Sequence, residues 1–88
     1  MVIKWFINFE EVIEVLDNGR FLTYYKIGVM KFSEKLYQGP KEIVLEQDVK
    51  RFFCVTLRTL NNENIILEKI PTRKQANERL DEVKAVFG

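Results

Sequence analysis

The feature that most constrains the fold is a change of hydrophobic period at Pro71. Before this residue, apolar and polar side chains alternate on either side of a polar turn, Asn61-Asn62-Glu63-Asn64. A period of two is typical of half-buried strands. The pattern therefore predicts a long β-hairpin with strands over 52–60 and 63–70.

After Pro71 the period becomes helical. Thr72 is a favourable N-cap, and Gln75 three residues later completes a T-x-x-Q capping box. One apolar stripe then follows at spacings of four, three and four, formed by Ala76, Leu80, Val83 and Phe87. Such a stripe predicts an amphipathic helix that packs on a core, with Gly88 placed to end it.

A second turn signal lies nearer the N-terminus, at Asp17-Asn18-Gly19. Asn-Gly between apolar stretches favours a two-residue type I′ hairpin turn, because both residues tolerate positive φ. The flanks are rich in β-branched and aromatic residues, which suits strands over 12–17 and 20–28. Residues 2–17 also fit one apolar face of a helix, so both interpretations stay open. Composition and the Asn-Gly turn favour strands.

With strands at the N-terminus, the chain has seven strands followed by one helix. Gly28 marks a bend or bulge, and Gln38-Gly39-Pro40 marks another turn. The 88 residues, 47% of them hydrophobic, suffice for one domain over 1–88. The predicted class is α+β and mostly β: a strongly bent antiparallel sheet with a C-terminal amphipathic helix. The expected strands are 2–9, 12–17, 20–28, 29–37, 42–46, 52–60 and 63–70.

Three segments carry a resemblance to a known family: Phe53-Cys54-Val55-Thr56-Leu57-Arg58, Ile65-Ile66-Leu67-Glu68 and Thr72-Arg73-Lys74-Gln75-Ala76-Asn77-Glu78-Arg79-Leu80. They are similar to the hairpin-then-helix ending of small bacterial pleckstrin-homology-like (PH-like) domains. The order of elements over nearly the whole chain also resembles the PH-like roll, in which the last helix plugs one open end. The resemblance implies binding rather than catalysis. Members that bind phosphoinositides use a basic first loop, whereas the equivalent loop here, Glu10-Glu11, is acidic.

The inventory of reactive residues argues against an enzyme. The chain has no His, so the usual general base near neutral pH is missing. Cys54 is the single cysteine, which excludes an internal disulfide and a zinc site, and Ser33 lies in no G-x-S-x-G motif. No glycine-rich phosphate loop is present. We therefore expect a non-enzymatic protein without a cofactor or metal, and Cys54 as an ordinary strand residue.

Charge and hydropathy set further expectations. The formal net charge of +1 argues against a dedicated nucleic-acid binder. The N-terminus lacks the layout of a signal peptide, and no apolar run approaches the roughly 20 residues of a membrane span. The expected location is the cytoplasm, with peripheral membrane contact left open.

Adjacent aromatic residues provide the candidate binding site. Neighbouring side chains on a strand point to opposite faces, so pairs such as Tyr24-Tyr25 place one ring on a second, exposed surface. Exposed apolar surface usually marks a partner. We therefore predict an interaction domain that binds a protein partner or a second copy of itself. The predicted binding residues are Trp5, Phe6, Tyr24, Tyr25 and Phe52.

Two alternatives come from other functional classes. Residues 20–41 form a predominantly basic stretch, which could bind an anionic membrane or ligand; lysines that keep an edge strand soluble would give the same pattern. The predicted anion-binding residues are Lys26, Lys31, Lys35 and Lys41. A small enzyme with an unrecognised carboxylate site is the remaining alternative.

Overall fold

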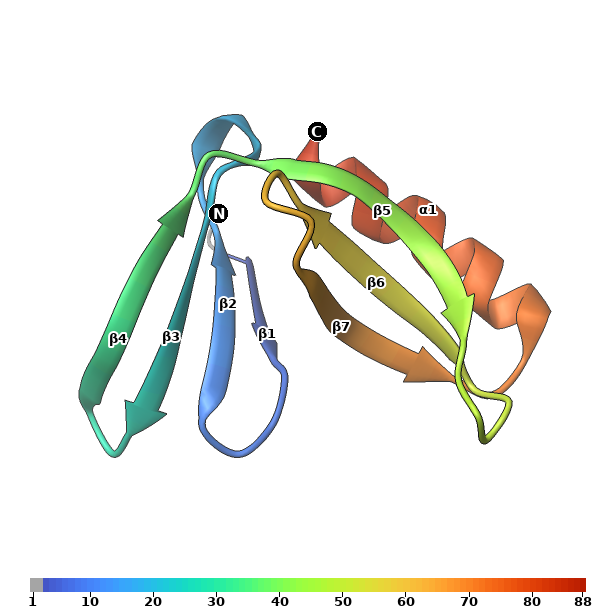
Figure 1. Cartoon of the computed structure of the whole chain (residues 1–88), viewed down its shortest axis with the longest axis horizontal. Coiled ribbons are helices and arrows are strands. Elements are labelled where there is room, and N and C mark those ends of the chain that lie inside the picture. The colour runs from blue at the N-terminus through green and yellow to red at the C-terminus, as the bar shows by residue number, and fades with distance from the viewer. Residues whose placement is uncertain (1–2) are drawn as a thin grey trace.

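Seven strands in two antiparallel sheets precede one C-terminal helix in the computed structural model, which describes residues 3–88 (Figure 1). The first sheet has the order β1-β2-β3-β4 and the second the order β5-β6-β7. The elements are β1 (Ile3–Phe6), β2 (Glu11–Val15), β3 (Phe21–Ile27), β4 (Met30–Tyr37), β5 (Pro40–Gln47), β6 (Phe53–Thr59), β7 (Asn64–Ile70) and α1 (Arg73–Phe87).

The predicted α+β, mostly β class is confirmed, and the N-terminal segment forms strands rather than a helix. The strands divide over two sheets instead of forming one bent sheet. The predicted start of the first strand, Val2, lies outside the described residues. β1 ends at Phe6 rather than at residue 9, because Asn8 turns the chain: its Oδ1 accepts the backbone N–H groups of Glu10 and Glu11 at 2.9 and 3.0 Å.

The turn at Asn18-Gly19 has the positive φ angles, 62° and 76°, that a type I′ turn requires. The loop is one residue longer than predicted. The Leu16 N–H donates to the Arg20 carbonyl at 2.7 Å, so the hairpin closes around three residues, Asp17–Gly19. Gly19 is also constrained by packing, since a Cβ there would lie 2.8 Å from the carbonyl oxygen of Phe87.

Gly28 belongs to a tight turn rather than to a bend, because Ile27 pairs directly with Met30 across it. Its φ of 60°, with no positive φ at Val29, has the signs of a type II′ turn.

The pairing of β3 with β4 contains a β-bulge, because the register shifts between Thr23 and Tyr25. This β-bulge holds Ser33 at a φ of 54°, which is uncommon for a residue with a Cβ.

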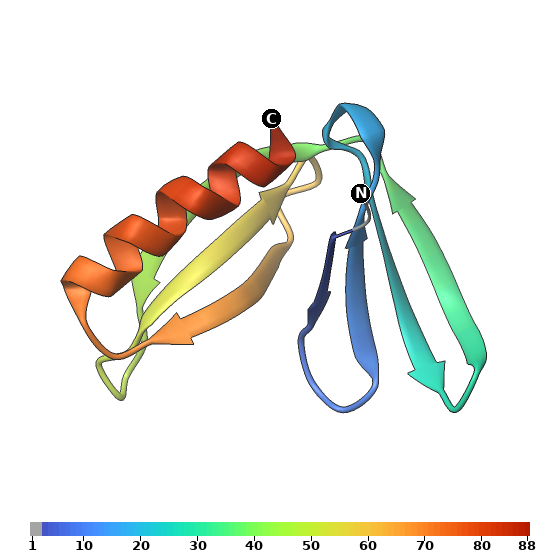
Figure 2. The same ribbon diagram turned by 180° about the vertical axis from the view of Figure 1, so that it is seen from behind.

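The core lies between the sheets and beneath the helix. We call the face of the first sheet that carries Trp5, Ile13 and Phe21 its inner face, and the opposite face its outer face. α1 lies along one face of the second sheet, and its C-terminal turn reaches the junction of the sheets (Figures 1 and 2). The buried core cluster is Trp5, Ile13, Val15, Phe21, Ile43, Val55, Leu57, Leu67, Val83 and Phe87.

Phe87, at the end of the helix, joins the two ends of the chain. Its ring stacks on Trp5, with centroids 5.7 Å apart, and meets Phe21 edge-on at 5.8 Å.

The predicted cap at the N-terminal end of α1 is confirmed. The Thr72 hydroxyl accepts a hydrogen bond from the Gln75 backbone N–H at 3.4 Å. The same hydroxyl donates to the side-chain Oε1 of Gln75 at 2.9 Å.

Candidate functional site

Two of the five predicted binding aromatics are buried, which corrects the expectation that they are exposed. Trp5 is 8% exposed: it stacks on Phe87, and its Nε1 donates to Glu68 Oε2 at 2.9 Å. Tyr24 is 2% exposed and donates its hydroxyl to Glu14 at 3.1 Å, beneath the Lys31 ammonium. Burial and this hydrogen bond raise the pKa of Tyr24.

The other three aromatics are exposed, but they do not share one surface. Phe6 pairs with Val12 and shares the outer face of the first sheet with Tyr24. Tyr25 points to the inner face by alternation, where a hydrogen bond and the charge of Glu11 raise its pKa. Phe52 precedes β6 in the second sheet.

The four predicted anion-binding lysines are likewise dispersed. Lys31 Nζ lies 3.8 Å from Glu14 on the outer face, and Lys26 is opposite Lys31 in the register. Lys35 Nζ is 3.3 Å from Glu63 Oε1, and Lys41 donates to Asn62 at 3.0 Å. Two of the four charges are thus compensated by carboxylates, and the set forms no common basic patch.

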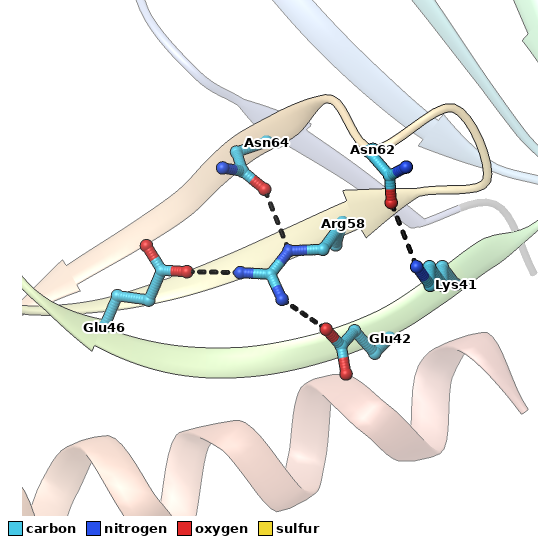
Figure 3. Close-up of polar contacts among 6 residues, drawn as sticks. All are labelled: Lys41, Glu42, Glu46, Arg58, Asn62 and Asn64. Carbon is cyan, nitrogen blue, oxygen red and sulfur yellow. Dashed lines mark hydrogen bonds and ion pairs between the residues drawn. The ribbon is translucent and has the colours of Figure 1, made fainter.

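Lys41 instead lies beside a cluster of polar side chains on the second sheet, in which the charge of Arg58 is balanced by carboxylates (Figure 3). The guanidinium donates to Glu42, to Glu46 at 2.6 Å and, through Nε, to Asn64 at 3.1 Å. Arg58 therefore joins side chains of all three strands and stabilises the sheet, with three of its five N–H donors engaged.

A concentration of exposed apolar side chains occurs where the β1–β2 loop and the β3–β4 turn lie at the same end of the first sheet (Figures 1 and 2). The Lys26 N–H, which donates to the Glu10 carbonyl at 2.7 Å, links these two segments. We call this end the apolar loop end. Its side chains, each more than half exposed, are Phe6, Phe9, Ile27, Val29 and Met30.

A cavity of about 280 Å³ lies on the inner face of the first sheet, where the start of β7 approaches it. Its apolar wall includes Ile7, Ile13 and Ile65. Two further hollows beside the C-terminal end of α1 are more open. The polar residues that line the cavity include Glu11, Thr23, Tyr25, Ser33, Lys35, Tyr37 and Glu63.

Three of these polar groups close one side of the cavity. Lys35 Nζ and the Tyr37 hydroxyl donate to the two oxygens of Glu63, at 3.3 and 3.1 Å. Hydrogen bonds to Tyr37 and Glu63 raise the pKa of Lys35, which keeps it charged. Sequence reasoning did not bring these residues together, because Glu63 lies in a turn of the other sheet.

The surroundings of Cys54 disfavour the reactive form of its side chain. Burial raises the pKa of the Cys54 thiol, and the charge of Asp48 adds to this shift, so the reactive thiolate is disfavoured. Within residues 3–88, no group of three or more His, Cys, Asp or Glu side chains is arranged to hold a metal ion. In the same residues, no helix combines the length and hydropathy needed to cross a membrane.

Comparisons with protein-family models, with curated proteins and with solved structures found no match for this chain.

Proposed function

We propose that this protein is a non-catalytic interaction domain that binds a protein partner, or a second copy of itself, through the apolar loop end. The supporting observation is the exposure there: Phe9 is 103% and Val29 95% exposed, and three further large apolar side chains are exposed at the same end of the sheet. Apolar side chains this exposed contribute nothing to the core, and clustered ones commonly mark a contact surface.

The order of elements also resembles that of a PH-like domain, and the proposal includes this resemblance. Four strands, three strands and a final helix follow one another over the described chain. Of the predicted aromatics, Phe6 belongs to the apolar loop end and Tyr25 lies one residue pair beyond Lys26. Trp5 belongs to the core, and Tyr24 is buried on the outer face beneath Lys31.

Val29→Ser tests the proposal, with Val49→Ser as a matched control. Val49 is 99% exposed in the loop between β5 and β6, which lies at the end of the second sheet away from the first sheet (Figure 1). Burying a valine side chain contributes about 1.5–3 kcal/mol, so Val29→Ser should weaken association by about tenfold or more. Phe9→Ser should have a similar effect, while Val49→Ser should not.

Sedimentation velocity over a wide concentration range measures self-association, and crosslinking in an extract compares the proteins captured by each variant. Circular dichroism confirms that all variants fold. Equal association and equal capture by wild type, Val29→Ser and Val49→Ser would refute the proposal.

A second candidate function, peripheral binding to an anionic membrane, is favoured by the order of side chains along the β3–β4 hairpin. From the tip inwards lie Val29, then the aliphatic pair Ile27–Met30, then the pair Lys26–Lys31. At about 3.3 Å per residue, this order matches an apolar tip in the interface and lysines at the level of lipid headgroups.

In this candidate, the membrane is contacted by the apolar tip together with Lys26 and Lys31 alone, because the four predicted lysines are dispersed. Cosedimentation with phosphatidylglycerol vesicles should be lost in Val29→Ser and reduced in Lys26→Gln, and it should fall as salt increases. Lys41→Gln is the matched control. Binding that is absent, or that depends equally on Lys41, would exclude the membrane function.

A further inference from the structure

We propose that the cavity on the inner face of the first sheet binds a small organic cation, with an ammonium group at Glu11 and an apolar body against the isoleucines. The cavity borders the apolar loop end but shares no lining residue with it, and the inference does not depend on the function proposed for that surface.

The charge of the cavity comes from one uncompensated carboxylate. Among its lining residues, Lys35 and Glu63 form an ion pair and neutralise each other. Glu11 forms no ion pair within residues 3–88, although it is only partly exposed. The lining therefore carries a net negative charge, which an ammonium ligand would balance.

Neutral neighbours hold Glu11 in place. Asn8 Nδ2 donates to Glu11 Oε2 at 2.9 Å, while Asn8 Oδ1 accepts the backbone N–H of Glu11 at 3.0 Å. Across the strand pair, Tyr25 is the register partner of Glu11, so the two side chains share a face. A carboxylate fixed beside an aromatic ring is a favourable partner for an ammonium group, through a charge-assisted hydrogen bond and a cation–π contact.

The other lining residues also have features of a binding pocket. Ser33 lines it from the β-bulge with a φ of 54°, a conformation that costs free energy and is concentrated at functional sites. Ile7, Ile13 and Ile65 supply apolar surface. The volume of about 280 Å³ lies just below the range typical of drug-sized ligands, which selects a small molecule.

Three probes of similar shape and different charge test the inference: 2-phenylethylammonium, neutral 2-phenylethanol and anionic phenylacetate. Binding is measured by titration of backbone amide NMR shifts in the intact chain. We expect the ammonium probe to shift amides of Glu11, Tyr25 and Ile65, with an affinity at least about tenfold above that of the alcohol, since hydrogen bonds to charged groups are the stronger ones. Phenylacetate should bind most weakly.

Glu11→Gln should remove the preference for the ammonium probe over the alcohol. Glu10→Gln is the matched control, since Glu10 is the adjacent exposed carboxylate and does not line the cavity. Ile65→Ala reports on the apolar wall and should weaken both the ammonium and the alcohol.

Three results would overturn the inference: no shifts at the cavity residues, equal affinity for ammonium and alcohol, or equal loss in the Glu10 and Glu11 variants. Because Phe9 and Val29 do not line the cavity, Val29→Ser should keep ammonium binding. Failure of either proposal therefore leaves the other testable.

Discussion

Replacing Glu68 by alanine tests whether the two sheets are joined through Trp5. Glu68 Oε2 accepts the indole N–H at 2.9 Å, and both carboxylate oxygens lie within 2.9 Å of Arg79 Nε. Removing the acceptor leaves a largely buried N–H unsatisfied, at about 1–3 kcal/mol. Arg79 is 38% exposed, so the lost ion pair adds only about 0–1 kcal/mol.

The free energy of unfolding should therefore fall by about 1–4 kcal/mol. In a domain of this size, 1 kcal/mol corresponds to about 4–8 °C, so the thermal midpoint should fall by roughly 4–30 °C. Thermal unfolding is followed by circular dichroism and by the fluorescence of Trp5, the single tryptophan. Emission should shift to the red as Trp5 loses its contact with the second sheet.

Glu82→Ala is the control for this prediction. Glu82 is exposed and pairs with the same arginine at 2.7 Å, but it has no contact with the indole nitrogen. Its removal should cost less than about 0.5 kcal/mol. If Glu68→Ala and Glu82→Ala destabilise the protein equally, the link through Trp5 does not contribute to stability as argued.

Three further predictions concern single positions. Gly19→Ala should destabilise by at least about 1–2 kcal/mol in urea denaturation, because φ is positive and the new Cβ would contact the Phe87 carbonyl. Burial raises the pKa of Asp48, but backbone N–H groups including that of Phe52 outweigh it and leave the pKa lowered. Asp48→Asn should therefore lose stability at neutral pH, and this loss should vanish as acid protonates the wild-type carboxylate below its folded pKa. Iodoacetamide should alkylate Cys54 more slowly in the folded than in the urea-unfolded protein, since burial raises the thiol pKa.

Local sequence signals predicted the elements well. The change of period at Pro71 and the T-x-x-Q box placed the helix correctly, because both act over a few residues. The Asn18-Gly19 signal predicted the backbone angles but not the length of the loop. The β-bulge in β4 was not predicted: it places Phe32 and Tyr37 on one face although they are five residues apart.

The exposure of aromatic residues was the part that local sequence could not determine. Alternation shows that Tyr24 and Tyr25 face opposite ways, but not which face is covered. Lys31 and Glu14 cover Tyr24 from neighbouring strands, and Phe87 covers Trp5 from the far end of the chain. The cavity was unpredictable for the same reason, since Glu11 and Glu63 meet only through the packing of two sheets.

The stacking of Phe87 on Trp5 and Phe21 has a consequence for folding during synthesis. Translation delivers the N-terminal strands first, yet the aromatic cluster that closes their core needs a residue from the end of the helix. Pairing over such a sequence separation is slow. A ribosome-bound nascent chain stalled before Phe87 should therefore leave Trp5 and Phe21 open to chaperones, and the cluster can form only once that phenylalanine has emerged from the exit tunnel.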